Sequence, residues 1–285
     1  DDEETELYDV KEFYRMKYQD TRIYLLDFQR SANQVFDGTL PVYEDDGIIL
    51  GVRDKNVEYM MNDAATVIAF VQEGDLWSYS PGNEKVNQVF SFRKLKDGDF
   101  RDSRTQHDIK IVRVTDEGDI DFVLYGYMNR GEHEGESGVS LCKYSYEDNI
   151  VEERLYIPMD KPYDILSQNV GRIAYLADEN TFYILMDDTL YSIDIVSKEV
   201  MTVVSGLVDG TYAVSENGDA IAYSMNGRLY STDSIRIFNM STDSEKIIKA
   251  DDNEYIRCLG YINGDFVYGI ARSEEHTSEL QSHEP

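Results

Sequence analysis

One short apolar string recurs along the chain at a slowly shrinking spacing. Successive copies begin 54, 51, 48 and 45 residues apart: Ile68–Phe70, Phe122–Tyr125, Ile173–Tyr175, Ile221–Tyr223 and Phe266–Tyr268. A period of roughly 40–50 residues is typical of a repeat that folds as one four-stranded sheet. The spacing therefore predicts a repeated β unit.

A pair of β-rich runs around a polar turn follows each of the first four strings. The paired runs are 76–79 with 86–90, 139–144 with 151–157, 190–195 with 200–204, and 235–238 with 246–248. Apolar and polar residues alternate within them, as in strands that form a hairpin. Turns rich in Gly, Asp and Asn precede several strings and supply the positive φ of tight turns. Each unit is predicted to consist of a turn, a central strand and an outer hairpin, in that order. Residues 21–27 and 31–36 are predicted to form the outer hairpin of an earlier unit.

The central strings indicate sheets that are covered on both sides. In 67–71, Ile68 and Phe70 point to one face and Ala69 to the other, because side chains alternate along a strand. Large residues on one face and a small residue on the opposite face let successive sheets nest closely. The predicted fold class is all-β, a β-propeller-like array of four-stranded antiparallel blades, with about four to five blades visible and the array incomplete.

Composition excludes several classes of partner. Hydrophobic residues at 41% are enough for a packed core, whereas a net charge of −29 repels phosphate backbones and anionic lipid surfaces. No nucleic-acid ligand is therefore expected. No apolar run approaches the ~20 residues of a membrane span. The two cysteines, Cys142 and Cys258, are too few for a disulfide framework and are expected to be small buried residues.

The C-terminal residues resemble a translated cloning artefact. Residues 272–282 match the in-frame translation of a short-read sequencing adapter. We therefore expect 272–285 to be a non-native tail and the natural sequence to stop at Ala271, in the middle of an element. The tail holds one Arg and four Glu, which leaves a net charge of −26 on residues 1–271. It also holds two of the four His, which leaves His107 and His133. Asp1 is not an initiator Met, so a missing start is expected too. Residues 1–271 are predicted to form one incomplete propeller-like domain.

Candidate chemistry is sparse, and no catalytic, cofactor-binding or metal-binding residue is assigned. Residues 135–138 with His133 come nearest to a nucleophile neighbourhood, but they do not form Gly-x-Ser-x-Gly. The cluster Glu132–Glu134 with Glu136 could hold a divalent cation, but it lacks the His-Glu-x-x-His spacing. A solvated loop is the expected role for both.

Two further features resemble ligand sites but have structural alternatives. Asp97 and Asp99, with Asp102 and Asp108, have a calcium-loop composition but lack its register and its closing Glu. Trp77 could line a ligand surface, but its place in a repeated strand favours packing. Binding residues lie on loops more often than on strands. The two longest interruptions of the repeat, 93–108 and 129–138, are therefore where a recognition surface is expected.

Two segments resemble a known type of repeat. Residues 65–79 (Ala-Thr-Val-Ile-Ala-Phe-Val-Gln-Glu-Gly-Asp-Leu-Trp-Ser-Tyr) and 215–230 are similar to the repeats of TolB-like and dipeptidyl-peptidase-type propellers. That resemblance implies a scaffold, a partner-binding surface or an access filter. The whole chain also resembles uncharacterised membrane-anchored extracytoplasmic proteins of anaerobic Gram-positive bacteria. This second resemblance implies a cell-surface or secreted location, with an anchor in a missing N-terminal segment.

The expected function is a non-enzymatic extracytoplasmic binding or scaffold protein, with an unknown protein or cell-surface ligand and no cofactor. Two alternatives stay open. One is the accessory propeller of a serine peptidase or other hydrolase whose catalytic domain is missing, which a downstream Gly-x-Ser-x-Gly would favour. The other is an open repeat array of a surface assembly, which further repeats without ring closure would favour.

Overall fold

The computed structural model describes residues 6–39, 42–44, 47–50, 57–94 and 98–272. The chain divides into two compact units, residues 1–163 and 164–285, and each is described by itself. Asp97 and the adapter-like residues 273–285 lie outside the described residues. The single domain over 1–271 remains a prediction.

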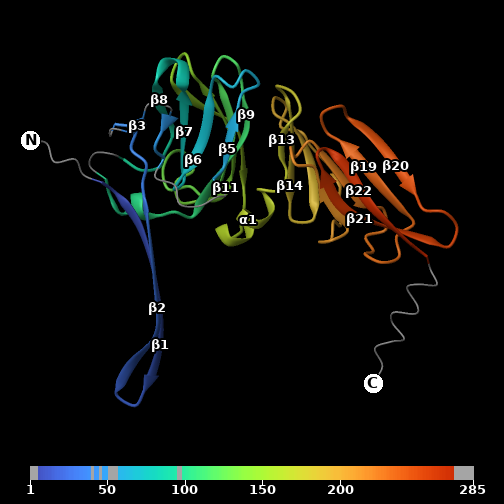
Figure 1. The fold of residues 1–285 in the computed structure, drawn as a ribbon, viewed down its shortest axis with the longest axis horizontal. Helices are drawn as coiled ribbons and strands as arrows, with labels where there is room; N and C mark the ends of the chain where they lie inside the picture. The colour runs from blue at the N-terminus through green and yellow to red at the C-terminus, as the bar shows by residue number, and fades with distance from the viewer. Residues whose placement is uncertain (1–5, 40–41, 45–46, 51–56, 95–97, 273–285) are drawn as a thin grey trace, which may run out of the picture. The chain divides into compact units, whose positions relative to one another are not determined.

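The first unit contains two four-stranded antiparallel sheets in which each strand pairs with the next along the chain (Figure 1). The first sheet comprises β5 (Tyr59–Met61), β6 (Ile68–Gln72), β7 (Asp75–Ser80) and β8 (Lys85–Phe90). The second comprises β9 (His107–Val114), β10 (Ile120–Tyr127), β11 (Ser137–Ser145) and β12 (Ile150–Pro158). Short elements surround them: the pair β3 (Tyr43–Glu44) and β4 (Gly47–Ile48), and the 3-10 turns η1 (Pro81–Asn83) and η2 (Phe100–Ser103).

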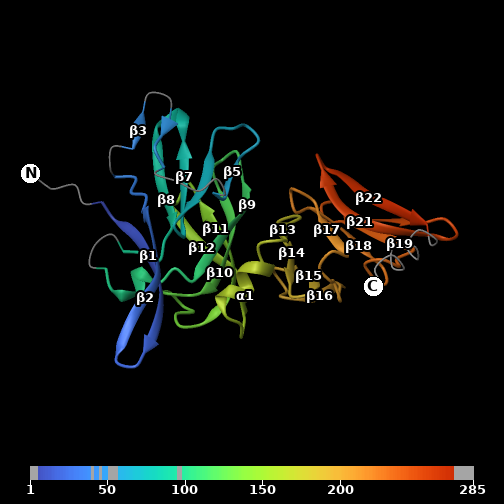
Figure 2. The ribbon, with the colours of Figure 1, turned by 60° about the horizontal axis from the view of Figure 1, so that its bottom comes forward.

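The second unit repeats the same topology (Figure 2). One sheet comprises β13 (Ala174–Leu176), β14 (Thr181–Met186), β15 (Thr189–Asp194) and β16 (Val200–Val204), and the next β17 (Tyr212–Val214), β18 (Ala220–Ser224), β19 (Ser234–Asn239) and β20 (Ser244–Lys249). The pair β21 (Glu254–Ile262) and β22 (Asp265–Arg272) follows, and α1 (Tyr163–Asn169) precedes the first of these sheets. Four such meander sheets and a fifth pair of strands confirm the predicted all-β array of propeller-type blades.

The central strings pack as their alternation predicts. Ala69 contributes to the apolar cluster between the two sheets of the first unit, whereas Phe70 packs with Trp77 in a cluster on the other face of its sheet. In the second unit, Ile221 faces β14 and β15, while Ala222 packs against β21. A small residue at the sheet-to-sheet contact lets the next sheet approach closely. The predicted nesting of the next sheet against a small residue is therefore confirmed in both units.

One string lies in a different strand from the one predicted. In four copies the string falls in the second strand of its sheet, but Ile173–Tyr175 falls at the first strand, β13. The second strand of that sheet is β14, which is also apolar on both faces. Because the first two strands of this sheet are both buried, apolar periodicity could not tell them apart.

The predicted N-terminal hairpin is wrong in its pairing. Residues 21–27 and 31–36 do not face each other, because β2 (Arg22–Gln34) runs on without a turn and pairs with β1 (Tyr8–Gln19). The chain reverses instead at Asp20, whose φ of 54° is the left-handed conformation that a tight hairpin turn needs. Figure 1 shows the resulting ribbon extending away from the sheets of the first unit.

Trp77, Cys142 and Cys258 are packing residues of the strands. Trp77 is buried, and its ring contacts Phe36 edge to face at 4.9 Å between centroids. Cys142 and Cys258 are buried and free, and burial raises the pKa of their thiols to about 12 and about 11. Within the described part of the chain, no helix is long and apolar enough to cross a membrane.

Candidate functional site

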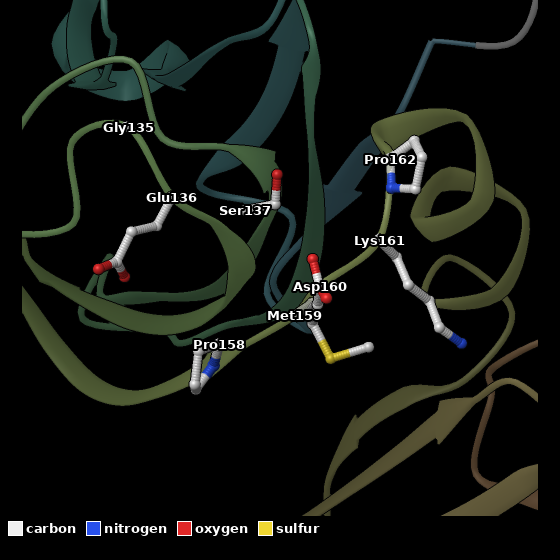
Figure 3. Close-up of a pocket in the computed structure, with 8 residues that line it drawn as sticks. All are labelled: Gly135, Glu136, Ser137, Pro158, Met159, Asp160, Lys161 and Pro162. Atoms are coloured by element: carbon white, nitrogen blue, oxygen red, sulfur yellow. The ribbon is translucent and has the colours of Figure 1, made fainter.

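An open pocket of about 680 Å³ lies in the first unit beside the longest insertion of its second sheet (Figure 3). Its lining comes from two segments, residues 135–137 at the start of β11 and residues 158–162 after the end of β12. The two segments meet because Gly138 pairs with Pro158 across these neighbouring strands. One of the two predicted recognition loops, 129–138, therefore forms a wall of this pocket.

Backbone hydrogen bonds fix both walls. The Met128 N–H donates to the Glu136 carbonyl at 2.9 Å, and the Gly135 N–H donates to the Met128 carbonyl at 3.0 Å. The Met159 N–H donates to the Ser137 carbonyl at 2.9 Å and extends the β11–β12 ladder by one step. The pocket is consequently formed by the fold itself, so a ligand would not have to order these segments.

Aromatic rings form a layer next to the pocket. A Cβ on Gly138 would lie 2.7 Å from two carbons of the Tyr156 ring, so this ring rests directly on the glycine backbone. The His133 ring stacks on the same tyrosine, with 3.5 Å between centroids and 5° between planes. Only a residue without a side chain allows this layering, which explains why position 138 is glycine.

Carboxylates engage both ring nitrogens of His133. Its Nε2 lies 3.0 Å from Glu153 Oε1, and its Nδ1 lies 3.7 Å from Glu136 Oε2. The Tyr156 hydroxyl donates to Glu136 Oε2 at 3.2 Å. Burial, followed by this hydrogen bond, raises the pKa of Tyr156 to about 12, so the phenol stays neutral. The site is a polar network around an imidazole, with an acidic rim.

The nucleophile neighbourhood is only partly assembled. Ser137 lines the pocket, but His133 is oriented by Glu136 and Glu153. An activated serine needs a base within hydrogen-bond reach. Across the described residues of this loop, no serine hydroxyl is hydrogen-bonded to the imidazole. The described residues of this loop therefore do not form a serine–histidine pair.

The acidic cluster that was compared with a cation site, Glu132–Glu134 with Glu136, is divided in the structure. Glu134 turns away and pairs with Arg101, with 2.8 Å between Oε1 and Nη1, while Glu136 stays with His133 and Tyr156. Glu132 is exposed. No three His, Cys, Asp or Glu side chains in the described ranges could together hold a metal ion.

The calcium-like aspartates are neutralised by arginines. Asp99 caps η2 and pairs with Arg101 at 2.6 Å and with Arg130 at 2.9 Å, and Arg130 also pairs with Asp102 at 2.7 Å. Hydrogen bonds from Arg101 hold the pKa of Asp99 well below its usual range. Asp108 lies apart and accepts from the Tyr163 hydroxyl. Asp99 and Asp102 therefore form an arginine–carboxylate cluster with Arg101 and Arg130, which joins the two predicted recognition loops.

Sequence reasoning found the loop but missed the residues opposite it. Glu153, Tyr156 and Asp160 reach the site from β12 and the segment after it, about twenty residues further along the chain. The loop is also less uniform than its composition suggests. The Asn129 amide donates to the Arg104 carbonyl at 2.7 Å, and Arg130 Nε donates to the Phe92 carbonyl at 2.8 Å. The first two loop residues are thus structural, and residues 131–136 carry the exposed surface.

His107, the other histidine before the tail, is a core residue of β9. It is buried, and its Nε2 lies 2.9 Å from the Gly74 carbonyl. Burial lowers its pKa. As the pH falls through about 6.5, the unfolded chain binds a proton at this histidine that the folded chain does not bind. The free energy of unfolding therefore decreases as the pH falls through that value.

We expect the urea midpoint, followed by Trp77 fluorescence, to fall less between pH 7.5 and 5.5 in His107→Gln than in the wild type. Equal falls would contradict this role.

No protein-family model matches the sequence, and no curated protein shows significant similarity to it. Several solved structures are similar in backbone trace. An oligogalacturonate lyase in complex with manganese has 12% sequence identity and a TM-score of 0.39. The match covers 89% of this chain and 68% of the lyase chain. Porphyromonas gingivalis dipeptidyl peptidase 4 has 9% sequence identity and a TM-score of 0.36. The match covers 77% of this chain and 38% of the peptidase chain. Kluyveromyces lactis Hsv2p has 12% sequence identity and a TM-score of 0.36. The match covers 76% of this chain and 60% of the Hsv2p chain. Because these TM-scores are below 0.5, the blade assignment rests on the sheet topology of this chain alone.

Proposed function

We propose that this chain is a non-enzymatic binding protein that holds its ligand in the pocket between residues 135–137 and 158–162. The observation that carries the proposal is a pocket fixed by backbone hydrogen bonds on a loop that interrupts the repeat. Rigid scaffolds place recognition residues on such loops. A volume of about 680 Å³ falls within the roughly 300–1,000 Å³ of ligand sites.

The lining favours a basic ligand with an apolar part. Glu136 and Asp160 bring two carboxylates to the pocket and Lys161 brings one ammonium group, so the lining carries more negative than positive groups. Pro158, Met159 and Pro162 supply apolar surface (Figure 3). The net charge of −29 steers cationic groups toward the chain and repels nucleic acid. The ligand we propose is a protein segment in which a Lys or Arg side chain lies next to an apolar one.

The proposed place of action is outside the cytoplasm, at the cell surface or in secreted form. This part of the proposal is supported by the resemblance to extracytoplasmic, membrane-anchored proteins and by the two segments similar to TolB-like repeats, 65–79 and 215–230.

An array of short extended peptides tests the ligand class. Each peptide carries Lys or Arg beside Leu or Phe, and a reference array carries Glu at the basic position. We expect the full chain to bind the basic array selectively and to lose binding as salt rises, because the attraction is between charges. The double variant Glu136→Gln with Asp160→Asn is expected to weaken binding about tenfold or more.

The matched control is Glu117→Gln, which removes an exposed carboxylate from the β9–β10 turn, at the opposite end of β10 from the pocket. This variant is expected to bind like the wild type. Equal binding of the basic and acidic arrays would refute the ligand class. An equal loss in the control would show that overall charge, rather than the pocket, attracts the peptides.

A further inference from the structure

The β1–β2 hairpin has one apolar face and one charged face. In the observed register, Tyr14 pairs with Phe28, Met16 with Leu25, and Tyr18 with Ile23. Directly paired residues project from the same side of a two-stranded sheet, and side chains alternate along each strand. These six side chains therefore form one continuous apolar block, which we call the arm face. Within the block, the rings of Tyr14 and Phe28 lie 4.9 Å apart.

The opposite face of the hairpin is polar. It carries Lys11, Arg15, Lys17 and Arg22, together with Asp9 and Asp27, in a chain that is otherwise strongly acidic. Phe13 and Tyr24 are the large apolar residues on this side. Apolar and polar side chains thus alternate along the hairpin as they do in a sheet that packs one face on an apolar surface and exposes the other face to solvent.

Nothing in the described part of the chain covers the arm face. Its six side chains are exposed, from 46% at Phe28 to 72% at Tyr18. An isolated two-stranded hairpin is at best marginally stable in water, and an exposed apolar patch of this size marks an interaction surface. The arm face therefore requires an occupant.

A lipid bilayer is a poor occupant. Both edges of this two-stranded ribbon carry unpaired backbone N–H and C=O groups, and each such group costs several kcal/mol in hydrocarbon. The net charge of −29 also opposes approach to anionic lipid.

We propose that the occupant is the arm face of a second copy of this chain, packed face to face in a two-fold dimer. Six side chains that each expose on the order of 100 Å² would bury about 600 Å² per copy. That area is at the lower end of what a specific protein interface needs. A two-fold contact uses the same patch twice, and this patch is free of charge across its whole length.

Repulsion between the acidic bodies of the two copies favours arms running in opposite directions. If the two arms cross at Met16 and Leu25, Tyr18 and Ile23 of one copy cover Tyr14 and Phe28 of the other. Glu12 and Arg30 lie on the same face one step nearer the sheets and pair with each other, with 3.6 Å between Glu12 Oε1 and Arg30 Nε, so the turn of the second copy faces a neutral pair. The arm, about 40 Å long, keeps the two bodies of the first unit at opposite ends, several screening lengths apart.

Sedimentation velocity of the full chain over a concentration series tests the dimer. We expect reversible monomer–dimer behaviour in the wild type and an increase of the dissociation constant by tenfold or more in Tyr18→Lys, because a charge would enter the buried face. The matched control is Tyr24→Lys, the same change on the polar face, which is expected to leave the dimer unchanged. A wild type that stays monomeric throughout, or equal losses in both variants, would overturn the proposal.

A cysteine scan provides a second readout that does not depend on affinity. Cys142 and Cys258 are buried, so Met16→Cys adds an exposed thiol at the proposed crossing point. Mild oxidation is expected to give a disulfide-linked dimer of Met16→Cys and no more than background from Phe13→Cys on the opposite face. Equal cross-linking of the two variants would overturn the assigned face. Capture of the chain by neutral vesicles, lost in Tyr18→Lys, would overturn it in favour of a lipid surface.

Discussion

Replacing Phe122 by alanine is expected to bring the first unit close to unfolding at room temperature. Phe122 lies in β10 with 0% of its surface exposed, within the apolar cluster that joins the two sheets of this unit. Its ring packs against Phe90 of the neighbouring sheet, with 5.8 Å between centroids. A Phe→Ala change in such a core costs about 3–5 kcal/mol, and a whole domain is stable by only about 5–15 kcal/mol.

Trp77 makes this loss measurable in the first unit alone, because it is the only tryptophan of the chain. We expect the urea midpoint of Trp77 fluorescence to fall sharply in Phe122→Ala. Phe100→Ala serves as the control, since Phe100 is 75% exposed in η2 and its removal is expected to leave the midpoint nearly unchanged. Similar midpoints for Phe122→Ala and the wild type would show that the two sheets do not share a core.

The repeat could be predicted because its signal is local. Strands covered on both faces need apolar residues at every position, and the turns before them need residues that tolerate positive φ. Both requirements are visible in strings such as 216–223. The same local signal placed Ile173–Tyr175 in the wrong strand of its sheet, because β13 and β14 are buried alike.

The arm and the site depend on pairing between distant residues, which leaves little trace in the sequence. A continuous β2 can be told from two strands only when β1 is known to lie beside it. At the site, a bulge after Leu141 shifts the β11–β12 register. The shift sets Glu153 opposite Cys142 and Tyr156 opposite Ser140, so both side chains reach His133. A slip of one residue would turn these side chains to the other face.

Gly126 illustrates such a long-range requirement, and its replacement by alanine is expected to be among the most damaging single changes in the chain. The residue lies in β10 opposite Gly138, with a φ of +120°. A Cβ would collide with the Gln106 carbonyl, and it would lie 2.8 Å from His107 Cα and 3.0 Å from the Tyr163 ring. Two of these contacts are with backbone atoms of the paired segment, so no rotamer change can relieve them. We expect a loss of more than about 4 kcal/mol.

Gly131→Ala separates the two causes of that loss. Gly131 also has a positive φ, of +94°, but a Cβ there would meet nothing within 4 Å. Its replacement carries only the backbone strain of about 1–2 kcal/mol. We therefore expect the urea midpoint of Trp77 fluorescence to fall much further in Gly126→Ala than in Gly131→Ala. Equal decreases of the urea midpoint in the two variants would mean that strands β9 and β10 can move apart enough to accommodate a side chain at position 126. In that case the close approach of Gln106, His107 and Tyr163 to Gly126 would not determine which residue the position accepts.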